Sequence, residues 1–512
     1  MRKFMMRCFF LVWFLHGYIV GQCIVPNSEF KIRGFHLDFR TQVMTVQAIK
    51  DLADNLSKKG INTLIIEYEA TFPFLKHATL CNEYVFTRPE IEEIVNYCKK
   101  KGIDIIPLQN CFGHCEYILK HKRYAHLRED SKEVSQICPL KIAEAKNIFQ
   151  EIFREVAELH PSPYFHIGAD ETYLLGSCKR CKEVDKSRLF VDYVNAMCQL
   201  VKEMGKQPII WADIVLKYPE AIHDLPKDLI YVDWNYGWEP DYFGKLDNLL
   251  ALGARIWGAS SMRSHPDNIY LTQWMKHFSN LAVFIPFAQK YSYEGIIQTS
   301  WSTSGTYGFH YDTGWEIMEM QPIRQVYPMN GFQILIDAFC QAIDQEEPLD
   351  VEKFICDYAK QRYGFSEKDS KVFLRYFQLQ QVVVDSKSIL EGKKLNDWIE
   401  KHKLLQEKWQ TLSAQRNAEE FAHYGLMLDL RINYLKYKVI ENIFESTNYT
   451  PNQASDLLMR LENVIQHSQA LRQQFNLLQR SYLKSGQTEK INIMWTEKMN
   501  KLRNILQRHS RM

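Results

Sequence analysis

The sequence of 512 residues has almost no excess of charge: 63 Lys and Arg residues oppose 61 Asp and Glu residues, which leaves a formal net charge of +2. A surface that binds nucleic acid or anionic membrane needs a clear excess of positive charge, so the composition predicts neither partner. Internal repeats and low-complexity tracts are also lacking. With 46% hydrophobic residues, the chain can bury a full core and is long enough for more than one domain.

Beyond the N-terminus, no window approaches the length and apolarity of a membrane-spanning helix. The N-terminal segment has three cations, an apolar run over residues 8–20 and then the small Gly21, which is the pattern of a secretory signal peptide. A membrane anchor is the alternative, but the run is short for a span of about 20 residues and His16 interrupts it. Lipid attachment at Cys23 is disfavoured because a Gln precedes it. We therefore expect residues 1–22 to be a signal peptide and the protein to be exported, either periplasmic or secreted.

Strand-like apolar runs alternate with helical patterns between residues 30 and 346. The strand candidates lie at residues 32–39, 63–70, 103–110, 164–170, 207–213, 229–236, 254–260 and 295–301. The helix candidates lie at residues 45–58, 88–101, 141–160, 186–204, 241–252, 266–280 and 324–344. This alternation indicates a parallel sheet, and near-continuous apolar strands indicate that both of its faces are covered. Eight such units predict a (β/α)8 barrel. A doubly wound open sheet is the alternative, but no glycine-rich phosphate loop follows the first strand.

From residue 348 onward the pattern changes to long, charged, helical sequence with few glycines and heptad-like spacing. This pattern predicts an antiparallel helical domain over residues 348–512. It carries no catalytic signature, so we interpret it as a packing module or as the surface of a homo-oligomer.

The chain has twelve cysteines, or eleven once Cys8 is removed with the signal peptide. An odd number cannot pair completely within one chain. Cys178 and Cys181 form a CxxC motif, a spacing used by disulfides and by half of a zinc site. Cys81 or Cys138 could supply the second half. A disulfide, a zinc clip and free thiols all remain open for Cys178 and Cys181.

Reactive side chains follow the predicted strands where those strands end, which in a barrel is the face that carries the chemistry. The first strand ends with Asp38 and Arg40, and the fourth ends in FHIGADET, which contains Asp170 and Glu171. Tryptophans at four later strands are Trp211, Trp234, Trp257 and Trp301. A single buried Trp is usually a core residue, and an Asp before a helix is usually an N-cap. Together, however, these residues predict a pocket with acidic groups and aromatic walls that stack on sugar rings.

A pocket of this kind suggests glycoside cleavage, in which one carboxylic acid protonates the leaving oxygen and another group stabilises positive charge at the anomeric carbon. Neighbouring residues of a strand point to opposite faces, so Asp170 and Glu171 are poorly placed to flank one bond unless the chain turns there. A different arrangement suits a pair at a strand end. Glu171 would donate the proton, while Asp170 would hold a 2-acetamido group of the substrate whose carbonyl oxygen is the nucleophile.

The segment HIGADE matches the H-x-G-x-D-E signature of glycoside hydrolase family 20, the β-N-acetylhexosaminidases. Further segments resemble the hexosaminidase D branch of that family: RGFHLDF, IEYEATFPF, FGHCEYILKHKRYAHLRE, HIGADETYLLG and GIIQTSW. The resemblance extends over about residues 32–345. It implies a retaining, substrate-assisted hydrolase without a cofactor, which removes terminal non-reducing N-acetylglucosamine or N-acetylgalactosamine from a glycan or glycoconjugate.

The resemblance also implies roles for individual residues. Glu171 would be the general acid and base, Asp170 would orient the acetamido N–H and stabilise the oxazolinium ion, and Tyr236 would donate to the acetamido oxygen. The remaining residues with implied contacts to the sugar or supporting roles are His114, Arg40, Asp38, Trp211, Trp234, Trp257, Trp301, Asp213 and Glu319.

Two departures from the family pattern stand out. Many members carry an acid on strand three that pairs with the histidine of the Gly-His motif, whereas this chain has Gln109 and Asn110 there. Many also have a strand-one Arg-His pair for two sugar hydroxyls, and here Arg40 stands alone.

For Glu171 we expect a raised pKa, because Asp170 carries a like charge and the surroundings are partly apolar.

Two other functions compete with glycoside hydrolysis. A metal-dependent hydrolase would gather its ligands at the barrel mouth, from the set His36, Asp38, His114, His166 and Asp170. A non-catalytic carbohydrate-binding barrel would use the same aromatic walls but would not need the intact pair of acids.

Overall fold

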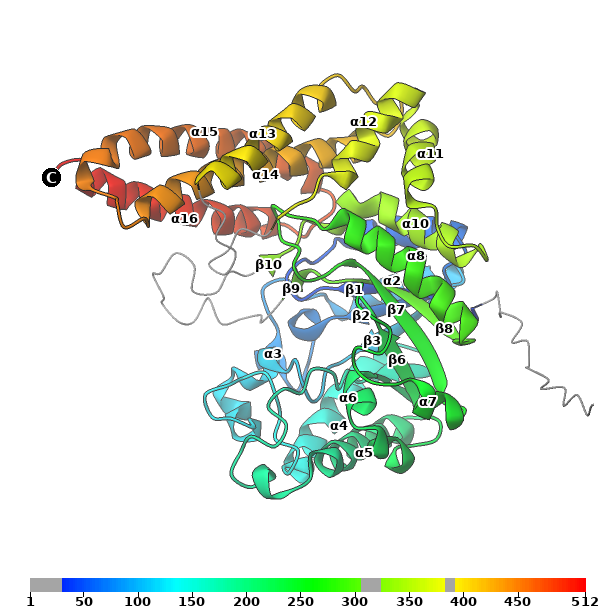
Figure 1. The fold of residues 1–512 in the computed structure, drawn as a ribbon. Coiled ribbons are helices and arrows are strands. Elements are labelled where there is room, and N and C mark those ends of the chain that lie inside the picture. The colour runs from blue at the N-terminus through cyan, green and yellow to red at the C-terminus, as the bar shows by residue number, and fades with distance from the viewer. Residues whose placement is uncertain (1–29, 305–323, 383–391) are drawn as a thin grey trace, which may run out of the picture.

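The computed structural model describes residues 30–304, 324–382 and 392–512 (Figure 1). Eight parallel strands form a closed barrel in which each strand pairs with the next and β8 returns to β1. The strands are β1 (Ile32–Asp38), β2 (Thr63–Glu67), β3 (Asp104–Leu108), β4 (Tyr164–His166), β5 (Gln207–Trp211), β6 (Ile230–Trp234), β7 (Arg255–Arg263) and β8 (Gly295–Ser300). The predicted (β/α)8 barrel is confirmed.

The strands are mostly apolar because both of their faces are covered. All five residues of β2 are buried, for example. Residues that point inward form a core of their own inside the barrel, which includes Ile65, Ile106, Ile209 and Val232. Residues that point outward pack against the surrounding helices. This burial on two sides is the physical reason why the strands appear in the sequence as near-continuous hydrophobic runs.

The helices around the barrel are α1 (Val46–Lys58), α2 (Arg88–Lys100), α3 (Glu116–Leu119), α4 (Ile142–Leu159), α5 (Lys186–Glu203), α6 (Asp213–Lys217), α7 (Asp247–Ala251), α8 (Trp274–Lys290) and α10 (Gln333–Ile343). Side-chain caps fix several of their N-termini. Thr45 accepts a hydrogen bond from the amide of Ala48 at the start of α1, and Thr87 forms a capping box with Glu90 at the start of α2.

Helix α8 begins later than the sequence pattern predicts. The expected helix was 266–280, whereas α8 starts at Trp274. The carboxylate of Asp267 accepts hydrogen bonds from the amides of Ser264 and Gln273 and lies 2.6 Å from Nε2 of His277. These bonds hold residues 264–273 as a loop at the end of β7. The predicted helix at 241–252 is likewise reduced to the five residues of α7.

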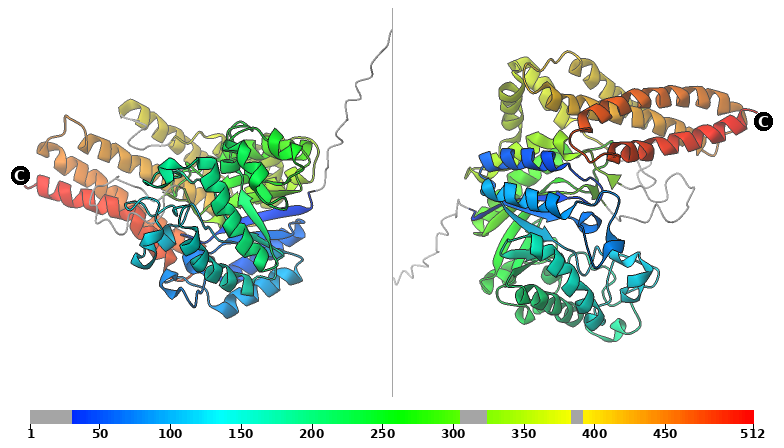
Figure 2. Two further views of the ribbon diagram at one scale, coloured as in Figure 1. Left: turned by 90° about the horizontal axis from the view of Figure 1, so that it is seen from below. Right: turned by 180° about the vertical axis from the view of Figure 1, so that it is seen from behind.

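A helical region follows the barrel and lies to one side of it (Figures 1 and 2). Its helices are α11 (Val351–Tyr363), α12 (Glu367–Gln378), α13 (Gly392–Trp409), α14 (Ala418–Phe444), α15 (Ala454–Gln479) and α16 (Gln487–His509). Consecutive helices pack side by side. The buried residues of α15 include Leu457, Leu461, Val464, Ser468, Leu471 and Phe475, which follow the alternating spacing of four and three that the sequence showed. The predicted domain boundary falls between α10 and α11, and a homo-oligomer through this region stays a prediction.

The helical region meets the barrel at loops on the carboxyl ends of the strands. After β1, the amide of Thr45 donates to the carbonyl of Tyr482, and the amide of Lys484 donates to the carbonyl of Val43. After β7, the amide of Thr272 donates to Oε1 of Gln381. The helices therefore support the rim of the face on which barrel enzymes carry their chemistry.

No helix within the described ranges is both long and apolar enough to cross a membrane. The expected signal peptide, residues 1–22, and the candidate Glu319 both lie outside the described residues.

Candidate active site

The two adjacent acids lie in a sharp turn directly after β4. That strand ends at His166, and the backbone is left-handed at Gly168 (φ 70°), Ala169 (φ 71°) and Glu171 (φ 47°). Left-handed backbone at the two non-glycine residues costs on the order of 1–3 kcal/mol each and is typical of functional sites. Because the chain turns here, the carboxylates of Asp170 and Glu171 can face the same point although they are neighbours in the sequence.

Two glycines let the surrounding loops approach this turn closely. A Cβ atom on Gly113 would lie 2.3 Å from the carbonyl oxygen of Asp170, and one on Gly168 would lie 2.1 Å from Oδ1 of Asn110. Any larger residue would push the loop after β3 away from the loop after β4. His114 follows Gly113 directly and is thereby carried to the acids.

His114 bridges the two carboxylates. Its Nε2 atom lies 3.3 Å from Oδ2 of Asp170 and 3.2 Å from Oε2 of Glu171. Asp170 is buried, whereas His114 and Glu171 are half-buried. The prediction that His114 lies near the acid is confirmed by this geometry, and the three side chains form a triad that we call the His114 triad.

The charges of the triad depend on one another. Burial acts to lower the pKa of His114, but the Asp170 carboxylate and the hydrogen bond to Glu171 outweigh burial and raise that pKa well above its usual value. Burial acts to raise the pKa of Glu171, but the hydrogen bonds from His114 and Tyr173 outweigh it and hold that pKa below its usual value. The resting triad is therefore an imidazolium between two carboxylates.

The expectation of a raised Glu171 pKa is wrong for this resting state. Apolar surroundings and repulsion from Asp170 would raise the pKa of Glu171, but the His114 cation between the two acids lowers it by more. Tyr173 was also missed: its exposed ring places the hydroxyl 2.5 Å from Oε1 of Glu171, to which it donates. Its position two residues after the acid was the one signal in the sequence.

Asp213, at the start of α6, stabilises the turn that carries the two acids. Its Oδ2 atom accepts a hydrogen bond from the backbone amide of Glu171 at 3.0 Å, and its Oδ1 atom accepts one from the indole of Trp234 at 3.3 Å. Burial, followed by the charge of Asp170, raises the pKa of Asp213 to about 8. A neutral Asp213 adds no third negative charge beside the acids. Of the two roles implied for it, the contacts favour the supporting one.

Aromatic side chains form one wall beside the triad. The indole of Trp301 donates to the hydroxyl of Tyr236 at 3.0 Å, and the rings of Trp234 and Tyr236 lie 5.1 Å apart. Trp211 is buried, and its ring lies 6.0 Å from that of Trp301. Burial raises the pKa of Tyr236, so its hydroxyl stays protonated and can donate.

The wall extends further than the sequence pattern indicated. The ring of Trp238 lies 5.3 Å from Trp234 and 5.3 Å from Tyr242, and Phe243 packs on Trp234 at 4.4 Å. These residues follow β6 in the segment WNYGWEPDYF, whose density of aromatic residues was the available signal.

Trp257 does not belong to this wall, so its assignment to the pocket is a correction. It is the third residue of β7, pairs with Gly295 at the start of β8, and is completely buried. Its indole donates to Glu294 at 3.2 Å, and its ring lies 5.5 Å from that of Tyr164, the first residue of β4. Because β7 continues to Arg263, Trp257 lies at the amino ends of the strands, opposite the triad.

Arg40 and Asp38 form a fixed pair at the end of β1. The guanidinium binds the carboxylate through two hydrogen bonds of 3.0 Å, and it lies 5.1 Å from the ring centre of Trp301. Burial opposes the charge on Asp38, but Arg40 outweighs burial and lowers the Asp38 pKa to about 2. The pair thus connects β1 to the aromatic wall, and Glu67 lies 3.8 Å from the same guanidinium.

The ligand set proposed for a metal-dependent hydrolase does not assemble. In the described part of the chain, the group at the barrel mouth whose ligand atoms lie close enough to share an ion is His114, Asp170 and Glu171. His36 instead lies 3.5 Å from Glu67, and His166 packs on Trp211 with ring centres 4.6 Å apart.

The CxxC motif is joined by Cys138, not by Cys81. Sγ of Cys138 lies 3.9 Å from that of Cys178 and 3.6 Å from that of Cys181, and all three are free thiols. Cys81 instead donates to the carbonyl of Phe72.

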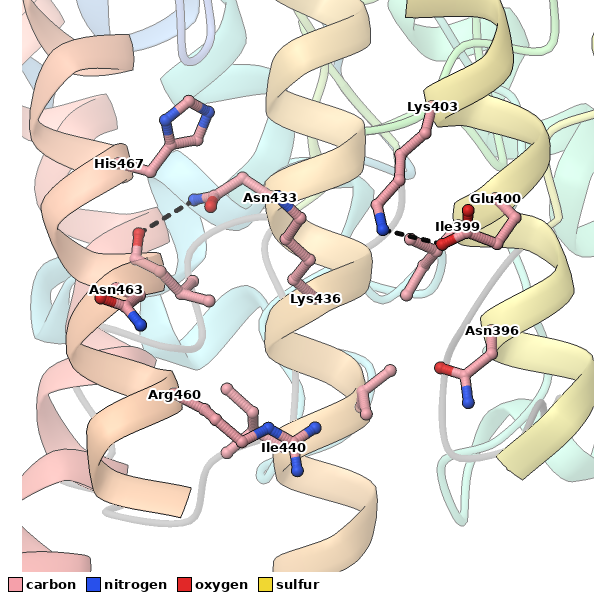
Figure 3. A pocket seen from close by; sticks show the side chains of 12 residues that line it. Asn396, Ile399, Glu400, Lys403, Asn433, Lys436, Ile440, Arg460, Asn463 and His467 are labelled. Atoms are coloured by element: carbon pink, nitrogen blue, oxygen red, sulfur yellow. Dashed lines mark hydrogen bonds and ion pairs between the residues drawn. The ribbon is translucent and has the colours of Figure 1, made fainter. Parts of the chain in front are cut away.

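A separate cavity of about 330 Å³ lies between α13, α14 and α15 (Figure 3). Its polar lining includes Lys403, which pairs with Glu400 at 2.7 Å, together with Lys436 and Arg460. All of its lining residues belong to the helical region, so it is distinct from the triad.

We predict that His114 stays protonated above the usual histidine pKa of about 6.5, because the neighbouring carboxylates stabilise the imidazolium. NMR titration of selectively labelled histidine should show this directly. Asp170→Asn removes the largest favourable charge and should shift the His114 titration to lower pH. A His114 signal that titrates at or below 6.5 in the unaltered protein would contradict the charge assignment.

We predict that Trp257→Phe lowers the free energy of unfolding by about 1–3 kcal/mol, because it removes buried contacts and the hydrogen bond to Glu294. Urea denaturation measures this loss. Since the residue lies at the opposite end of the barrel, the His114 titration should not change. A shift of that titration would place Trp257 back in the pocket.

The barrel part of the chain is similar in sequence to proteins of a known family. The model of "Glycosyl hydrolase family 20, catalytic domain" matches residues 30–306. Hexosaminidase D of Bos taurus is 28% identical over 293 residues, which cover 53% of this chain and 84% of the relative. Hexosaminidase D of Homo sapiens is 30% identical over 233 residues, which cover 43% of this chain and 48% of the relative. The chain thus spans about half the length of the human protein.

Solved structures of the same family are also similar. The β-N-acetylhexosaminidase of Bacteroides fragilis has a TM-score of 0.48 at 19% identity, with 65% of this chain and 70% of that chain covered. The chitobiase of Flavobacterium johnsoniae has a TM-score of 0.48 at 17% identity, with 94% of this chain and 72% of that chain covered. Because the family model covers more than half of the sequence, the chain belongs to glycosyl hydrolase family 20 and is a glycoside hydrolase.

Proposed function

We propose that the protein is an exo-acting β-N-acetylhexosaminidase, which releases terminal N-acetylglucosamine or N-acetylgalactosamine from a glycan or glycoconjugate by a retaining, substrate-assisted reaction. One observation carries the proposal. Oδ2 of Asp170 is held by His114, while Oδ1 is buried without a hydrogen-bond partner in the described chain. An unpaired buried acceptor is costly, and the N–H of an acetamido group would satisfy it.

The closeness of the two acids suits a substrate-assisted reaction. The ligand atoms of His114, Asp170 and Glu171 all lie within 4.8 Å of one another. Acids this close lie on one side of the site, so one of them can act on the leaving oxygen while the other binds the substrate group that attacks. Retention then follows because the anomeric carbon is attacked twice, first by the acetamido oxygen and then by water.

The nucleophile in this proposal is the substrate's own acetamido oxygen. Asp170 accepts the acetamido N–H and Tyr236 donates to the carbonyl oxygen, which together hold the group beneath the anomeric carbon. Attack by that oxygen forms a bond to the anomeric carbon while the glycosidic bond breaks. The resulting oxazolinium ion is positively charged, and the adjacent Asp170 carboxylate stabilises it.

Glu171 delivers the proton that the leaving oxygen needs. In the resting triad this proton is on His114, 3.2 Å from Oε2 of Glu171. When an acetamido N–H donates to Asp170, the electrostatic attraction between that carboxylate and the His114 imidazolium becomes weaker. The bound sugar also excludes water from Glu171. Both changes favour transfer of the proton from Nε2 to Glu171 and then to the leaving group. Glu171 afterwards takes a proton from the water that opens the oxazolinium ring.

The aromatic wall supports sugar binding beside this chemistry. Trp234 and Trp301 both contact Tyr236, and the guanidinium of Arg40 lies over the ring of Trp301. Trp211 closes the site from the interior of the barrel.

Export is part of the proposal and rests on the pattern of residues 1–22. A mature protein whose N-terminal sequence still begins at Met1 would contradict it.

We predict that the enzyme cleaves aryl 2-acetamido-2-deoxy-β-glycosides and not the matching β-glucoside or β-galactoside, whose 2-hydroxyl cannot form an oxazolinium ion. A panel of chromogenic substrates measures this selectivity, and a thiazoline mimic of the oxazolinium should inhibit competitively. Efficient hydrolysis of the plain β-glucoside, or a glycosyl ester trapped on a carboxylate of the protein, would refute the mechanism. Tight sugar binding without turnover would instead favour a non-catalytic barrel.

We predict that the two acids differ in how their variants respond to the leaving group. Glu171→Gln should slow substrates with poor leaving groups most, because those need the proton. Asp170→Asn should slow good and poor leaving groups alike, by on the order of 100-fold or more in kcat, because it removes the charge that faces the oxazolinium. Tyr173→Phe keeps both carboxylates but removes one hydrogen bond that lowers the Glu171 pKa, so it should shift the pH dependence without the leaving-group dependence of Glu171→Gln. If both acid variants showed the same leaving-group dependence, the assigned roles would be wrong.

A further inference from the structure

Two loops on the catalytic face meet at a group of sulfur and oxygen ligands outside the triad. Glu129 and Cys138 lie in the loop between β3 and α4, and Cys178 and Cys181 lie in the loop between β4 and α5. The ligand atoms of these four residues all lie within 4.8 Å of one another. We propose that Cys138, Cys178, Cys181 and Glu129 bind one structural zinc ion that joins the two loops.

The distances fit a tetrahedral zinc site. With Zn–S bonds of about 2.3 Å, two sulfurs on a tetrahedron lie about 3.8 Å apart, and with a Zn–O bond of about 2.0 Å a sulfur and an oxygen lie about 3.5 Å apart. The Sγ atom of Cys138 is 3.9 Å from that of Cys178 and 3.6 Å from that of Cys181. Sγ of Cys181 is 3.4 Å from Oε2 of Glu129.

A disulfide explains this group less well. A disulfide bond requires sulfurs about 2.05 Å apart, which is far shorter than either measured separation. It could also join only two of the three thiols, and the third would remain beside a buried carboxylate. The arrangement of three sulfurs around one point is what a metal requires and a disulfide does not.

The carboxylate of Glu129 supports a cation at this point. Glu129 is buried, and among the residues that the structure describes no Lys, Arg or His forms an ion pair with it. A buried carboxylate is expensive without a compensating charge. Its Oε1 atom accepts the amide N–H of Cys178 at 2.8 Å, which leaves Oε2 directed at the thiols. A metal ion between them would offset the charge.

The local backbone and surface charges also suit bound thiolates. The amide of Cys181 donates toward Sγ of Cys178 at 3.4 Å, an arrangement that stabilises negative charge on sulfur. Three thiolates and one carboxylate around Zn²⁺ leave two net negative charges. The exposed cations Lys179, Arg180 and Lys182 in the same turn oppose them. Sulfur-rich tetrahedral sites favour zinc over calcium or magnesium, which prefer oxygen ligands.

The site would brace the loop that carries the acids. Cys178 comes seven positions after Glu171, and the amide of Leu174 between them donates to Oε1 of Gln136 at 2.8 Å. Gln136 accepts the amide of Glu129 through its carbonyl, so the same short hairpin supplies both contacts. Zinc would thus hold the loop after β4 against the loop after β3, which also carries His114. Its role is positioning, with no contact to the substrate.

The test is the metal content of the full-length protein, purified without chelators and measured by mass spectrometry for zinc, iron and copper. We expect about one zinc per chain. Cys178→Ser should reduce the zinc content to near zero and lower the melting temperature. Cys356→Ser is the matched control, because Cys356 is equally half-buried but lies on α11, and its zinc content should not change.

A second measurement does not depend on whether the variant folds. Treatment of the unaltered protein with a chelator, followed by alkylation and intact mass analysis, should expose three additional reactive thiols. A protein without stoichiometric zinc, with iron in its place, or with a disulfide that includes Cys178 or Cys181 would overturn the proposal. None of these measurements requires glycosidase activity, so they stand apart from the test of the proposed function.

Discussion

The His114 imidazolium between Asp170 and Glu171 is the interaction on which the site depends. Two neighbouring carboxylates in a largely buried position repel each other and are costly to desolvate. The cation, 3.3 Å from one and 3.2 Å from the other, makes it possible for both to be ionised. That contact requires the left-handed turn at Ala169 and Glu171, the close approach of Gly113, and the hold of Asp213 on the Glu171 amide. Strain in the backbone is thus offset by electrostatic attraction between side chains.

Most of the fold could be predicted from the sequence, because burial on both faces makes parallel strands visible as apolar runs. All eight strands and the helices around α1, α2, α4 and α5 lie within a few residues of their predicted positions. Trp257 shows where such reasoning fails. An apolar run indicates that a strand exists, but not which of its residues lies at the open end of the barrel. That depends on where β7 ends, and its last three residues, Ser261 to Arg263, lie beyond the predicted strand at 254–260.

The three residues of the His114 triad were predictable, whereas their charges were not. The motif around Asp170 and Glu171 identified the acids, and the Gly-His motif identified His114. Their charges depend on distances between loops that are more than fifty residues apart in the chain, which no local pattern records. The same limit applies to Glu129 and to the choice between Cys81 and Cys138, since only folding shows which residues reach the CxxC motif. Glu319, implied by the resemblance, lies outside the described residues and stays a prediction.

The resting charges have a consequence for how recognition and catalysis are coupled. In the proposed mechanism Glu171 is the general acid and must be protonated at the start of the reaction, yet its pKa at rest is lowered while that of His114 is raised. Under that mechanism, substrate binding has to move the proton from His114 to Glu171. A ligand that donates a hydrogen bond to Asp170 weakens the attraction that keeps the proton on His114, whereas a sugar without that donor does not. In the proposed mechanism the acetamido group thus has two functions. It is the nucleophile, and its N–H favours transfer of the proton from His114 to Glu171. Selectivity for such sugars then follows from the position of one proton as well as from the shape of the pocket.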